Sequence, residues 1–348
     1  DSSTSRGLGD VYKRQLSEYL GIHLLGFEKS PISPIMIAII IGISIANFNS
    51  KIINELKPGL DFCIKVLLKI GIILLGIRLS LIDLISYGAK GLIVVIPCIV
   101  ITILLVQVLR KRLNISEKLS LLIAVGTSIC GATAIVALAP SIRAKKSEIT
   151  YAIANITIFG LFAMFLYPIF AHFLFSQNIV SAGLFLGSSI HETAQVAGSA
   201  MIYSDQYEEP NIIAVATVTK LIRNTLMVIV IPYLAHKSMS GQEKSYKISA
   251  IFPYFVIGFI VFGCIRSLGD FYFLDNEIHL ATWNNSIVFI KKIAEFFLII
   301  AMAAVGFNTS FDNFRELGIK PFYIGLIAAT TVGISSTVSY THLRAHET

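Results

Sequence analysis

The sequence predicts an all-α polytopic membrane protein with inverted structural repeats and two broken helices or re-entrant hairpins. Three observations predict this fold. Of the 348 residues, 55% are hydrophobic and 14% are charged, and the mean hydropathy is +0.76. A soluble domain carries about 25% charged residues, so this composition is typical of a chain embedded in lipid. The apolar residues gather in runs long enough to cross a membrane, and two of these runs contain nearly the same glycine- and hydroxyl-rich motif.

Ten apolar runs are expected to be membrane helices. In chain order they cover residues 31–47, 62–78, 91–109, 119–140, 149–175, 181–202, 211–235, 248–267, 286–306 and 321–337. No soluble domain separates them, so residues 16–337 are expected to form one transmembrane domain. The terminal stretches 1–15 and 338–348 resemble translated sequencing adaptors and are expected to be foreign to the domain, which leaves room for an N-terminal truncation.

The charges of the loops orient these runs, because basic loops stay on the cytoplasmic side. The loops on both sides of run 119–140 are basic, whereas the loops on both sides of run 181–202 contain no lysine or arginine. We therefore expect run 119–140 to be a hairpin that enters from the cytoplasm, and run 181–202 to be a hairpin that enters from outside. Two broken helices that cross the membrane are the alternative, since two extra crossings leave every later helix in the same orientation.

A second internal similarity supports the inverted repeats. Residues 76–90 match residues 306–320 at a constant offset of 230, with glycine, serine, glycine and lysine identical. By the loop charges, the helices that lead into these two stretches run in opposite directions, as inverted repeats require. The second hairpin precedes the second copy of this match, an order that a simple tandem duplication does not produce.

The two motifs predict the binding site of a transporter. Val125–Ile129 and Leu186–Ile190 share an apolar-Gly-hydroxyl-Ser-Ile pattern, and broken backbone at membrane depth is tolerated where it is buried in protein or lines a cavity. The expected substrate-binding residues are Gly126, Thr127, Ser128, Gly131, Ala132, Thr133, Ser188, Ser189, Thr193, Gln195, Lys220, Arg223 and Asn224. His191 and Glu192, which follow the second motif, are expected to carry a coupling proton.

The substrate is expected to be an anion. Lys220 and Arg223 are three residues apart and share a helix face, and the N-termini of broken helices offer free N–H groups. Two other roles stay open at this point. The two cations could snorkel or pair structurally with Glu192, and the glycines could serve close helix packing alone.

The sequence argues against an enzyme and against a metal or other cofactor. His191-Glu192 begins like the zinc motif HExxH, but Gln195 stands where the second histidine should be, and neither Ser128 nor Ser189 has a well-placed base. The four cysteines lack CxxC spacing and are expected to be small apolar side chains. The net charge of +7 belongs to loops, so no nucleic-acid partner is expected. The expected partners are a small anion, a coupling proton or sodium ion, and the lipid bilayer, and a homodimer is compatible with them.

The stretches GTSICGATAIVA (126–137) and GSSIHETAQVAGSA (187–200), together with residues 57–62 and 68–79, resemble a family of bacterial inner-membrane proteins assigned as sulfate exporters. The resemblance covers about residues 30–325. It implies a multi-pass protein of the bacterial inner (plasma) membrane, with an inverted-repeat fold shared by cation/proton antiporters and anion transporters. The expected function is a secondary transporter that exports a small oxyanion, sulfate or an organosulfonate, by alternating access. The alternatives are a sodium- or proton-coupled carrier of a carboxylate or amino acid, and a passive anion channel.

Overall fold

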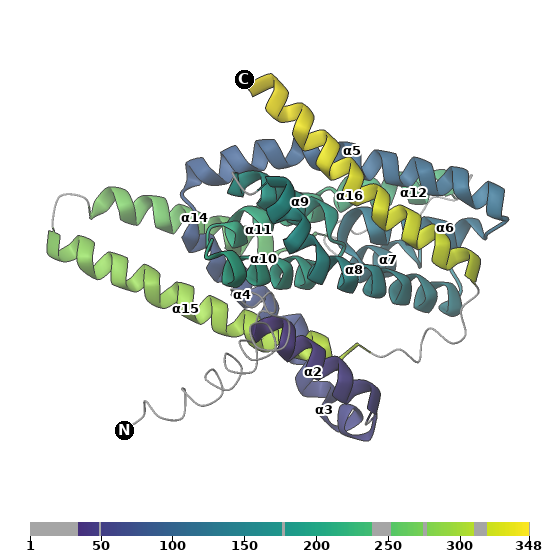
Figure 1. Ribbon diagram of the computed structural model, residues 1–348, viewed down its shortest axis with the longest axis horizontal. Coiled ribbons are helices and arrows are strands. Elements are labelled where there is room, and N and C mark those ends of the chain that lie inside the picture. The colour runs from purple at the N-terminus through teal and green to yellow at the C-terminus, as the bar shows by residue number, and fades with distance from the viewer. Residues whose placement is uncertain are drawn as a thin grey trace.

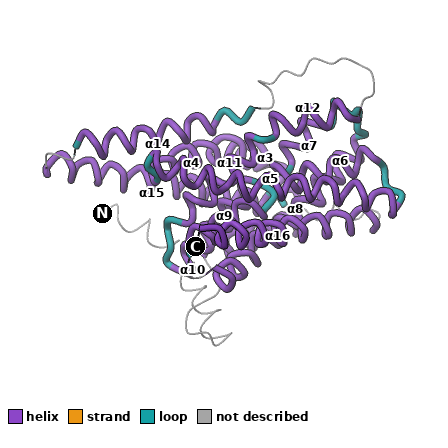
Figure 2. Tube along the Cα trace, turned by 90° about the horizontal axis from the view of Figure 1, so that it is seen from above, coloured by secondary structure: helices purple, strands orange, loops and turns teal. Residues whose placement is uncertain are grey.

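The computed structural model describes residues 34–48, 50–175, 178–238, 252–273, 277–309 and 319–347. These residues form helices and contain no strand, which confirms the prediction of an all-α fold (Figures 1 and 2). Five of the described helices are long and apolar enough to cross a membrane, and they cover Leu81–Leu113, Lys146–Phe175, Ile212–Ser238, Phe255–Tyr272 and Lys320–Thr341. A multi-pass membrane protein follows from this count.

The helices fall where the apolar runs predict them. Their bounds are α2 (Pro34–Phe48), α3 (Ser50–Phe62), the π-helical turn η2 (Cys63–Leu67), α4 (Leu68–Leu75), the 3-10 turn η3 (Gly76–Arg78), α5 (Leu81–Leu113), α6 (Glu117–Val125), the π-helical turn η4 (Gly126–Cys130), α7 (Ala132–Leu138), α8 (Lys146–Phe175), α9 (Ile179–Ser189), α10 (Thr193–Tyr207), α11 (Ile212–Thr225), α12 (Met227–Ser238), α14 (Phe255–Tyr272), α15 (Glu277–Phe307) and α16 (Ile319–Glu347). Helix α5 begins ten residues before the run predicted from residue 91, because Ser80 and Asp83 form a capping box there.

Helices α6 and α7, joined through η4, form a re-entrant hairpin, which we call hairpin 1. The chain reverses at Gly131, whose φ is +61°. The two ends of the hairpin lie side by side, since the Ser116 hydroxyl donates to the Glu148 carboxylate at 2.5 Å and the Lys118 ammonium donates to the Arg143 carbonyl at 2.9 Å. Both basic loops therefore lie at the same end of the molecule, as the hairpin prediction requires.

Helices α9 and α10 form a second hairpin, hairpin 2. The directions of its two arms follow from their contacts with α11. Gly183 packs on Val215 and Gly187 packs on Thr219, so α9 runs parallel to α11. The first residue of α10 accepts a hydrogen bond from Asn224 at 3.0 Å, near the end of α11, and a short loop joins the end of α10 to the start of α11. Helix α10 is therefore antiparallel to both α11 and α9, and the two arms form a hairpin and not a continuous crossing helix.

The two hairpins enter the molecule from opposite ends. Helix α8 starts at the open end of hairpin 1 and leads to the first residue of α9, and its 30 residues extend over about 45 Å at 1.5 Å per residue. In Figure 1 the arms α6 and α7 accordingly lie to the right of α9 and α10 along the long axis. The tips of the hairpins meet between these ends.

Two groups of helices can be distinguished by their packing. The hairpins, α5, α8, α11, α12 and α16 form one group, the hairpin unit, and α2, the run from α3 to η3, α14 and α15 form the other, the outer unit. In the outer unit Gly76 lies against the backbone carbonyl of Phe259 in α14, and Gly306 lies against the backbone carbonyl of Ile39 in α2. Gly76 and Gly306 are the pair related by the offset of 230, so the sequence match reflects equivalent packing of α4 on α14 and of α15 on α2.

The order of the repeats has a structural explanation. The first set reads α2, α4, α5, hairpin 1 and α8, and the second set reads hairpin 2, α11–α12, α14, α15 and α16. The second set is therefore a circular permutation of the first. Each hairpin precedes the long helix that lies beside it, and α5 and α16 begin within the matched stretches of the two sets.

Parts of the sequence predictions fall outside the described residues. These are the terminal stretch 1–15, the segment 310–318 of the internal match and the beginning of run 248–267. Helix α16 continues past residue 337 to Glu347, so it contains most of the stretch 338–348.

The hairpin topology can be tested by labelling. In a background without the four native cysteines, single cysteines at Lys111, Lys145 and Glu209 would be treated with an impermeant thiol reagent in intact cells. We expect Glu209→Cys to react from outside, and Lys111→Cys and Lys145→Cys to react only after the cells are opened. Labelling of Lys145→Cys in intact cells, with Lys111→Cys protected, would contradict hairpin 1.

Candidate functional site

Two cations from α11 lie between the hairpin tips, and both are completely buried, with 0% exposure for Lys220 and for Arg223. The Lys220 ammonium donates to the backbone carbonyls of Ile129 at 2.9 Å and Ile190 at 3.0 Å, and also to that of His191. These three bonds use all three donors of an ammonium group. The lysine therefore joins the tip of hairpin 1 to the tip of hairpin 2.

The guanidinium of Arg223 makes the same kind of connection with four hydrogen bonds. Its Nε donates to the Ser128 carbonyl at 2.6 Å, and its Nη1 donates to the carbonyls of Ser188 at 2.7 Å and Ile190 at 2.9 Å. Its Nη2 donates to the Thr127 carbonyl. Four of the five N–H donors of the arginine are thus directed at backbone carbonyls.

These carbonyls belong to helix ends. The last carbonyls of a helix have no partner within the helix, and the negative end of the helix dipole lies there. Hairpin 1 exposes such an end at η4 and hairpin 2 exposes another at α9, both away from water. An unsatisfied polar group in this setting costs several kcal/mol, so Lys220 and Arg223 serve as shared caps for the two broken helices.

The capping geometry decides between the roles that the sequence left open. Among the described residues, no ion pair joins Glu192 to Lys220 or Arg223. The side chains of both cations end at backbone carbonyls, and neither lines the cavity described below. Their positive charge acts on the site from behind the hairpin tips.

Glu192 connects the second arms of the two hairpins. Its carboxylate accepts a hydrogen bond from the Ala132 amide at 3.3 Å and forms a capping box with Gln195 at the start of α10. Gly131 makes this approach possible, because a Cβ atom there would lie 2.3 Å from the Glu192 Cγ. The Gln195 side chain donates in turn to the Thr157 carbonyl of α8 at 3.3 Å.

A polar cavity of about 430 Å³ reaches Glu192 from the end of the molecule where hairpin 1 is open. It lies between the hairpin unit and the outer unit. The residues that line it are Ile64, Ala132, Thr150, Ile153, Ala154, Thr157, Leu161, Glu192, Ala194, Gln195, Val305, Asn308 and Thr309. Glu192 is the charged member of this lining, and hydroxyl and amide side chains supply most of the remaining polarity.

The opposite end of the outer unit contacts the hairpin unit through Arg78. Arg78 pairs with Glu295 of α15, and its Nη1 donates to the carbonyl of Pro210 at 3.0 Å, in the loop between α10 and α11. The internal match pairs Arg78 with Asn308, which lines the polar cavity at the other end. Equivalent positions of the two repeats therefore make an inter-unit hydrogen bond at one end and line a cavity at the other.

Most of the predicted site residues belong to one of two groups, the cavity lining or the hairpin tips. Ala132, Glu192 and Gln195 line the cavity, while Gly126, Thr127, Ser128, Gly131, Ser188, His191, Thr193, Lys220 and Arg223 make up the tips and their caps. Ser188 and Ser189 direct their hydroxyls to carbonyls of α9, and Ser188 also bonds Ser336 of α16 at 2.6 Å. Thr133 is exposed and outside the cavity lining.

Three buried polar side chains at the tips keep unpaired atoms. The Ser128 hydroxyl, both ring nitrogens of His191 and the Asn224 side-chain oxygen have no hydrogen-bond partner among the described residues. The His191 ring lies near the backbone of Thr127 without meeting hydrogen-bond geometry. These atoms are free to bind a ligand or water that reaches the tips.

The sequence did not identify four polar residues of the cavity, which are Thr150, Thr157, Asn308 and Thr309. Only Asn308 carried a usable signal, because it lies in the internal match opposite Arg78. The two threonines of α8 follow no pattern that separates them from other helix threonines.

Comparisons with known proteins place the chain among membrane proteins. The family model described as "Conserved hypothetical protein 698" matches residues 15–325. Proteins named UPF0324 membrane protein are similar over most of their length. The one from Fusobacterium nucleatum is 31% identical over 88% of this chain and 88% of its own, and the one from Bacillus anthracis is 33% identical over 81% and 78%. The one from Bordetella bronchiseptica is 29% identical over 90% and 93%. No solved structure matches the chain.

Because the two hairpin tips lie close together, position 131 is expected to require glycine. Gly131→Ala should lower the free energy of unfolding by about 1–3 kcal/mol, because φ is positive there and the new methyl group meets Glu192. Thermal unfolding in detergent would measure the change. Gly59→Ala is the control, since a Cβ atom at Gly59 has nothing within 4 Å. Equal unfolding temperatures for the two variants would contradict the described contact.

The capping role of Arg223 predicts a loss of stability. Arg223→Gln should destabilise the protein by about 1.5–3 kcal/mol or more, because buried carbonyls lose a charged donor. Arg223→Lys should be intermediate, since it keeps the charge without the planar fork. Arg110→Gln removes a partly exposed pair with Glu117 and is the control, with an expected loss of at most about 1 kcal/mol. Unchanged stability of Arg223→Gln would instead make the arginine a direct ligand group.

Proposed function

The chain belongs to the family described as Conserved hypothetical protein 698, and from this premise we propose that it is a secondary transporter of a small oxyanion. Sulfate or an organosulfonate is the proposed cargo, exported by alternating access. The observation that carries the proposal is the meeting of two opposed hairpin tips at two buried cations beside a polar cavity. Broken helices that meet near the midplane of inverted repeats are the usual location of a carrier site.

The difference between the two ends of the molecule supports a carrier over a channel. The polar cavity approaches the tips at the end where hairpin 1 is open, while at the other end Arg78 of the outer unit, paired with Glu295, donates to the Pro210 carbonyl of the hairpin unit. A passive channel needs a continuous path, whereas a carrier alternates between one open end and the other. Relative movement of the outer unit and the hairpin unit would exchange the two ends.

The charge around the tips supports an anionic cargo. Lys220 and Arg223 contribute two positive charges and Glu192 contributes one negative charge, so the formal charges at the tips leave one positive charge in excess. In a low-dielectric setting this excess favours an anion. The hydroxyl of Thr150 and the amide of Asn308, which both line the cavity, can donate hydrogen bonds to its oxygen atoms.

One observation favours a second candidate. The charged residue that faces the cavity is the carboxylate of Glu192, and carboxylate, hydroxyl and carbonyl oxygens also suit a sodium ion. A sodium- or proton-coupled carrier of a carboxylate or amino acid would use Glu192 for the coupling ion. In both candidates Glu192 is the group that takes up or releases the coupling charge, and His191 stands beside it.

Counterflow in proteoliposomes tests the proposed function. Vesicles loaded with unlabelled sulfate, taurine, a dicarboxylate or buffer alone would be diluted into labelled sulfate, with and without a sodium gradient. We expect saturable accumulation of label that depends on internal sulfate or sulfonate. Accumulation that depends only on the dicarboxylate and sodium would support the second candidate, and non-saturable uptake without counterflow would support a channel.

The position of Glu192 at the cavity predicts how transport depends on pH. Glu192→Gln should abolish stimulation of net transport by a pH gradient and retain exchange at equilibrium, because a neutral side chain cannot carry the proton but lets the loaded carrier reorient. The measurement is uptake and counterflow across pH 5–8 for wild type, His191→Gln and Glu192→Gln. Glu117→Gln, at the exposed open end of hairpin 1, is the matched control. Wild-type pH profiles in both site variants would contradict proton coupling through this pair.

A further inference from the structure

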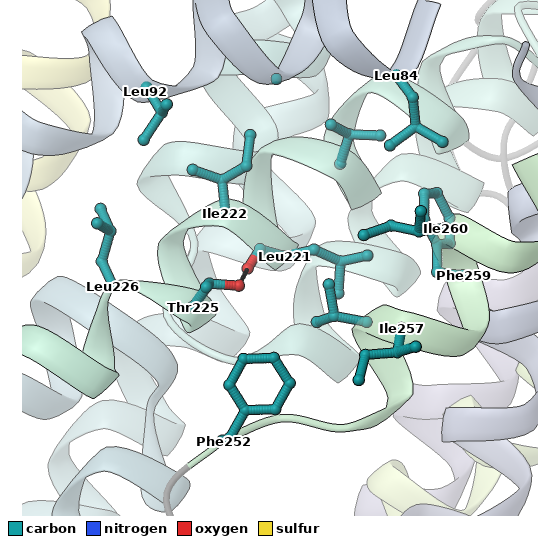
Figure 3. A pocket seen from close by; sticks show the side chains of 13 residues that line it. Leu84, Leu92, Leu221, Ile222, Thr225, Leu226, Phe252, Ile257, Phe259 and Ile260 are labelled. Atoms are coloured by element: carbon teal, nitrogen blue, oxygen red, sulfur yellow. Dashed lines mark hydrogen bonds between the residues drawn. The ribbon is translucent and has the colours of Figure 1, made fainter. Parts of the chain in front are cut away.

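A second cavity, of about 340 Å³, lies at the joint between the two units and is lined by apolar side chains. Figure 3 shows Leu84 and Leu92 of α5, Ile222 of α11 and Ile257 of α14 around it. The hydroxyl of Thr225, which also lines it, donates to the Leu221 carbonyl at 2.9 Å, so it is already paired. A cavity without free polar partners does not hold water in an ordered way.

The rim of this cavity is continuous with the apolar surface of the membrane helices. Leu92 is 40% exposed, Ile257 is 50% exposed and Ile260 is 40% exposed, and all three belong to helices of membrane-spanning length. Side chains of this kind on such helices face the hydrocarbon of the bilayer. Lipid is therefore the material expected at the rim.

We propose that the acyl chain of a membrane lipid occupies this cavity and packs between α14 of the outer unit and α5 and α11 of the hairpin unit. The lining and the rim together select hydrocarbon, since among the described residues they offer a polar ligand no charge and no free donor, and Thr225 is the one polar side chain of the lining. The cavity borders α11 at Leu221 and Ile222, next in sequence to the two capping cations. The lipid chain thus supports the rear of the helix that holds the hairpin tips, and it separates the two units where they would slide.

Gly88 offers a way to fill the cavity without a clash. It belongs to the lining, and a Cβ atom there would lie 3.7 Å from the Ile222 Cδ1, an ordinary van der Waals contact. A leucine at this position would extend into the space that the acyl chain takes. Gly59→Leu is the matched control, because Gly59 is remote from the cavity and a Cβ atom there meets nothing within 4 Å.

The experiment uses the full chain in nanodiscs of phosphatidylethanolamine and phosphatidylglycerol with a photoreactive diazirine on the acyl chain. After illumination, mass spectrometry of peptides locates the adducts. We expect adducts on Ile222 and Leu226 in the wild type and in Gly59→Leu. In Gly88→Leu the yield of these adducts should fall by roughly tenfold, because the leucine side chain fills part of the cavity and replaces apolar contacts that the acyl chain makes there. Labelling of Leu104, which is 60% exposed on the lipid-facing surface of α5, should stay unchanged and reports an intact fold.

Two outcomes would overturn the proposal. One is labelling of Leu104 without adducts on Ile222 and Leu226, which would leave the cavity to another occupant. The other is equal labelling of Ile222 in the wild type and in Gly88→Leu. If Gly88→Leu does not fold, Ile222→Ala replaces it, since this change widens the cavity. Labelling of Leu226 should then rise, and unchanged labelling would equally overturn the proposal.

Discussion

The backbone carbonyls at the ends of broken helices are the constraint on which the rest of this structure depends. Two helices, η4 and α9, end in the interior of a membrane protein, where their last carbonyls are buried and have no partner within the helix. Lys220 and Arg223 satisfy them with seven hydrogen bonds from a single helix (three from the lysine and four from the arginine). Without these cations, neither hairpin has a stable tip, and the second arms have no fixed starting point.

The helix dipole at the start of the second arm of hairpin 2 has the opposite sign to that at the ends of η4 and α9. Where η4 and α9 offer negative helix ends to the cations, α10 begins with a positive end that Glu192 occupies through its capping box. Gly131 lets the two tips approach closely enough for the same carboxylate to accept the Ala132 amide. The hairpin tips thus place two cations behind the backbone and one carboxylate at the cavity. A site of this kind can change its charge at the cavity by protonation of Glu192 while its capping cations stay in place.

The inverted repeats place equivalent residues at the two ends of the molecule. The glycines of the internal match, Gly76 and Gly306, hold equivalent helix pairs of the outer unit close together. Two residues further along, Arg78 contacts the hairpin unit at one end, and Asn308 lines the cavity at the other end. The difference between a charged and a neutral side chain at equivalent positions makes the two ends chemically unequal, although the helices around them correspond.

Much of this architecture could be predicted from the sequence, because lipid imposes strong rules on it. Apolar length located the helices, and the charges around runs 119–140 and 181–202 indicated hairpins from opposite sides. The role of Arg223 could not be derived, since a buried cation can meet a substrate or a carbonyl, and only the packing of η4 and α9 decides between them. Thr150 and Thr157 were missed for the same reason, because their cavity is formed by helices distant in sequence.

Cross-linking of the two tips tests this account most directly. The Cys130 Sγ of hairpin 1 lies 3.8 Å from the Thr193 Oγ1 of hairpin 2. In a protein without Cys63, Cys98 and Cys264, Thr193→Cys should therefore form a disulfide with Cys130 under mild oxidation in the membrane, detected by mass spectrometry of the linked peptides. Absence of this disulfide, with both cysteines still reactive to a small membrane-permeant thiol reagent, would show that the tips do not meet and would contradict the shared capping by Lys220 and Arg223.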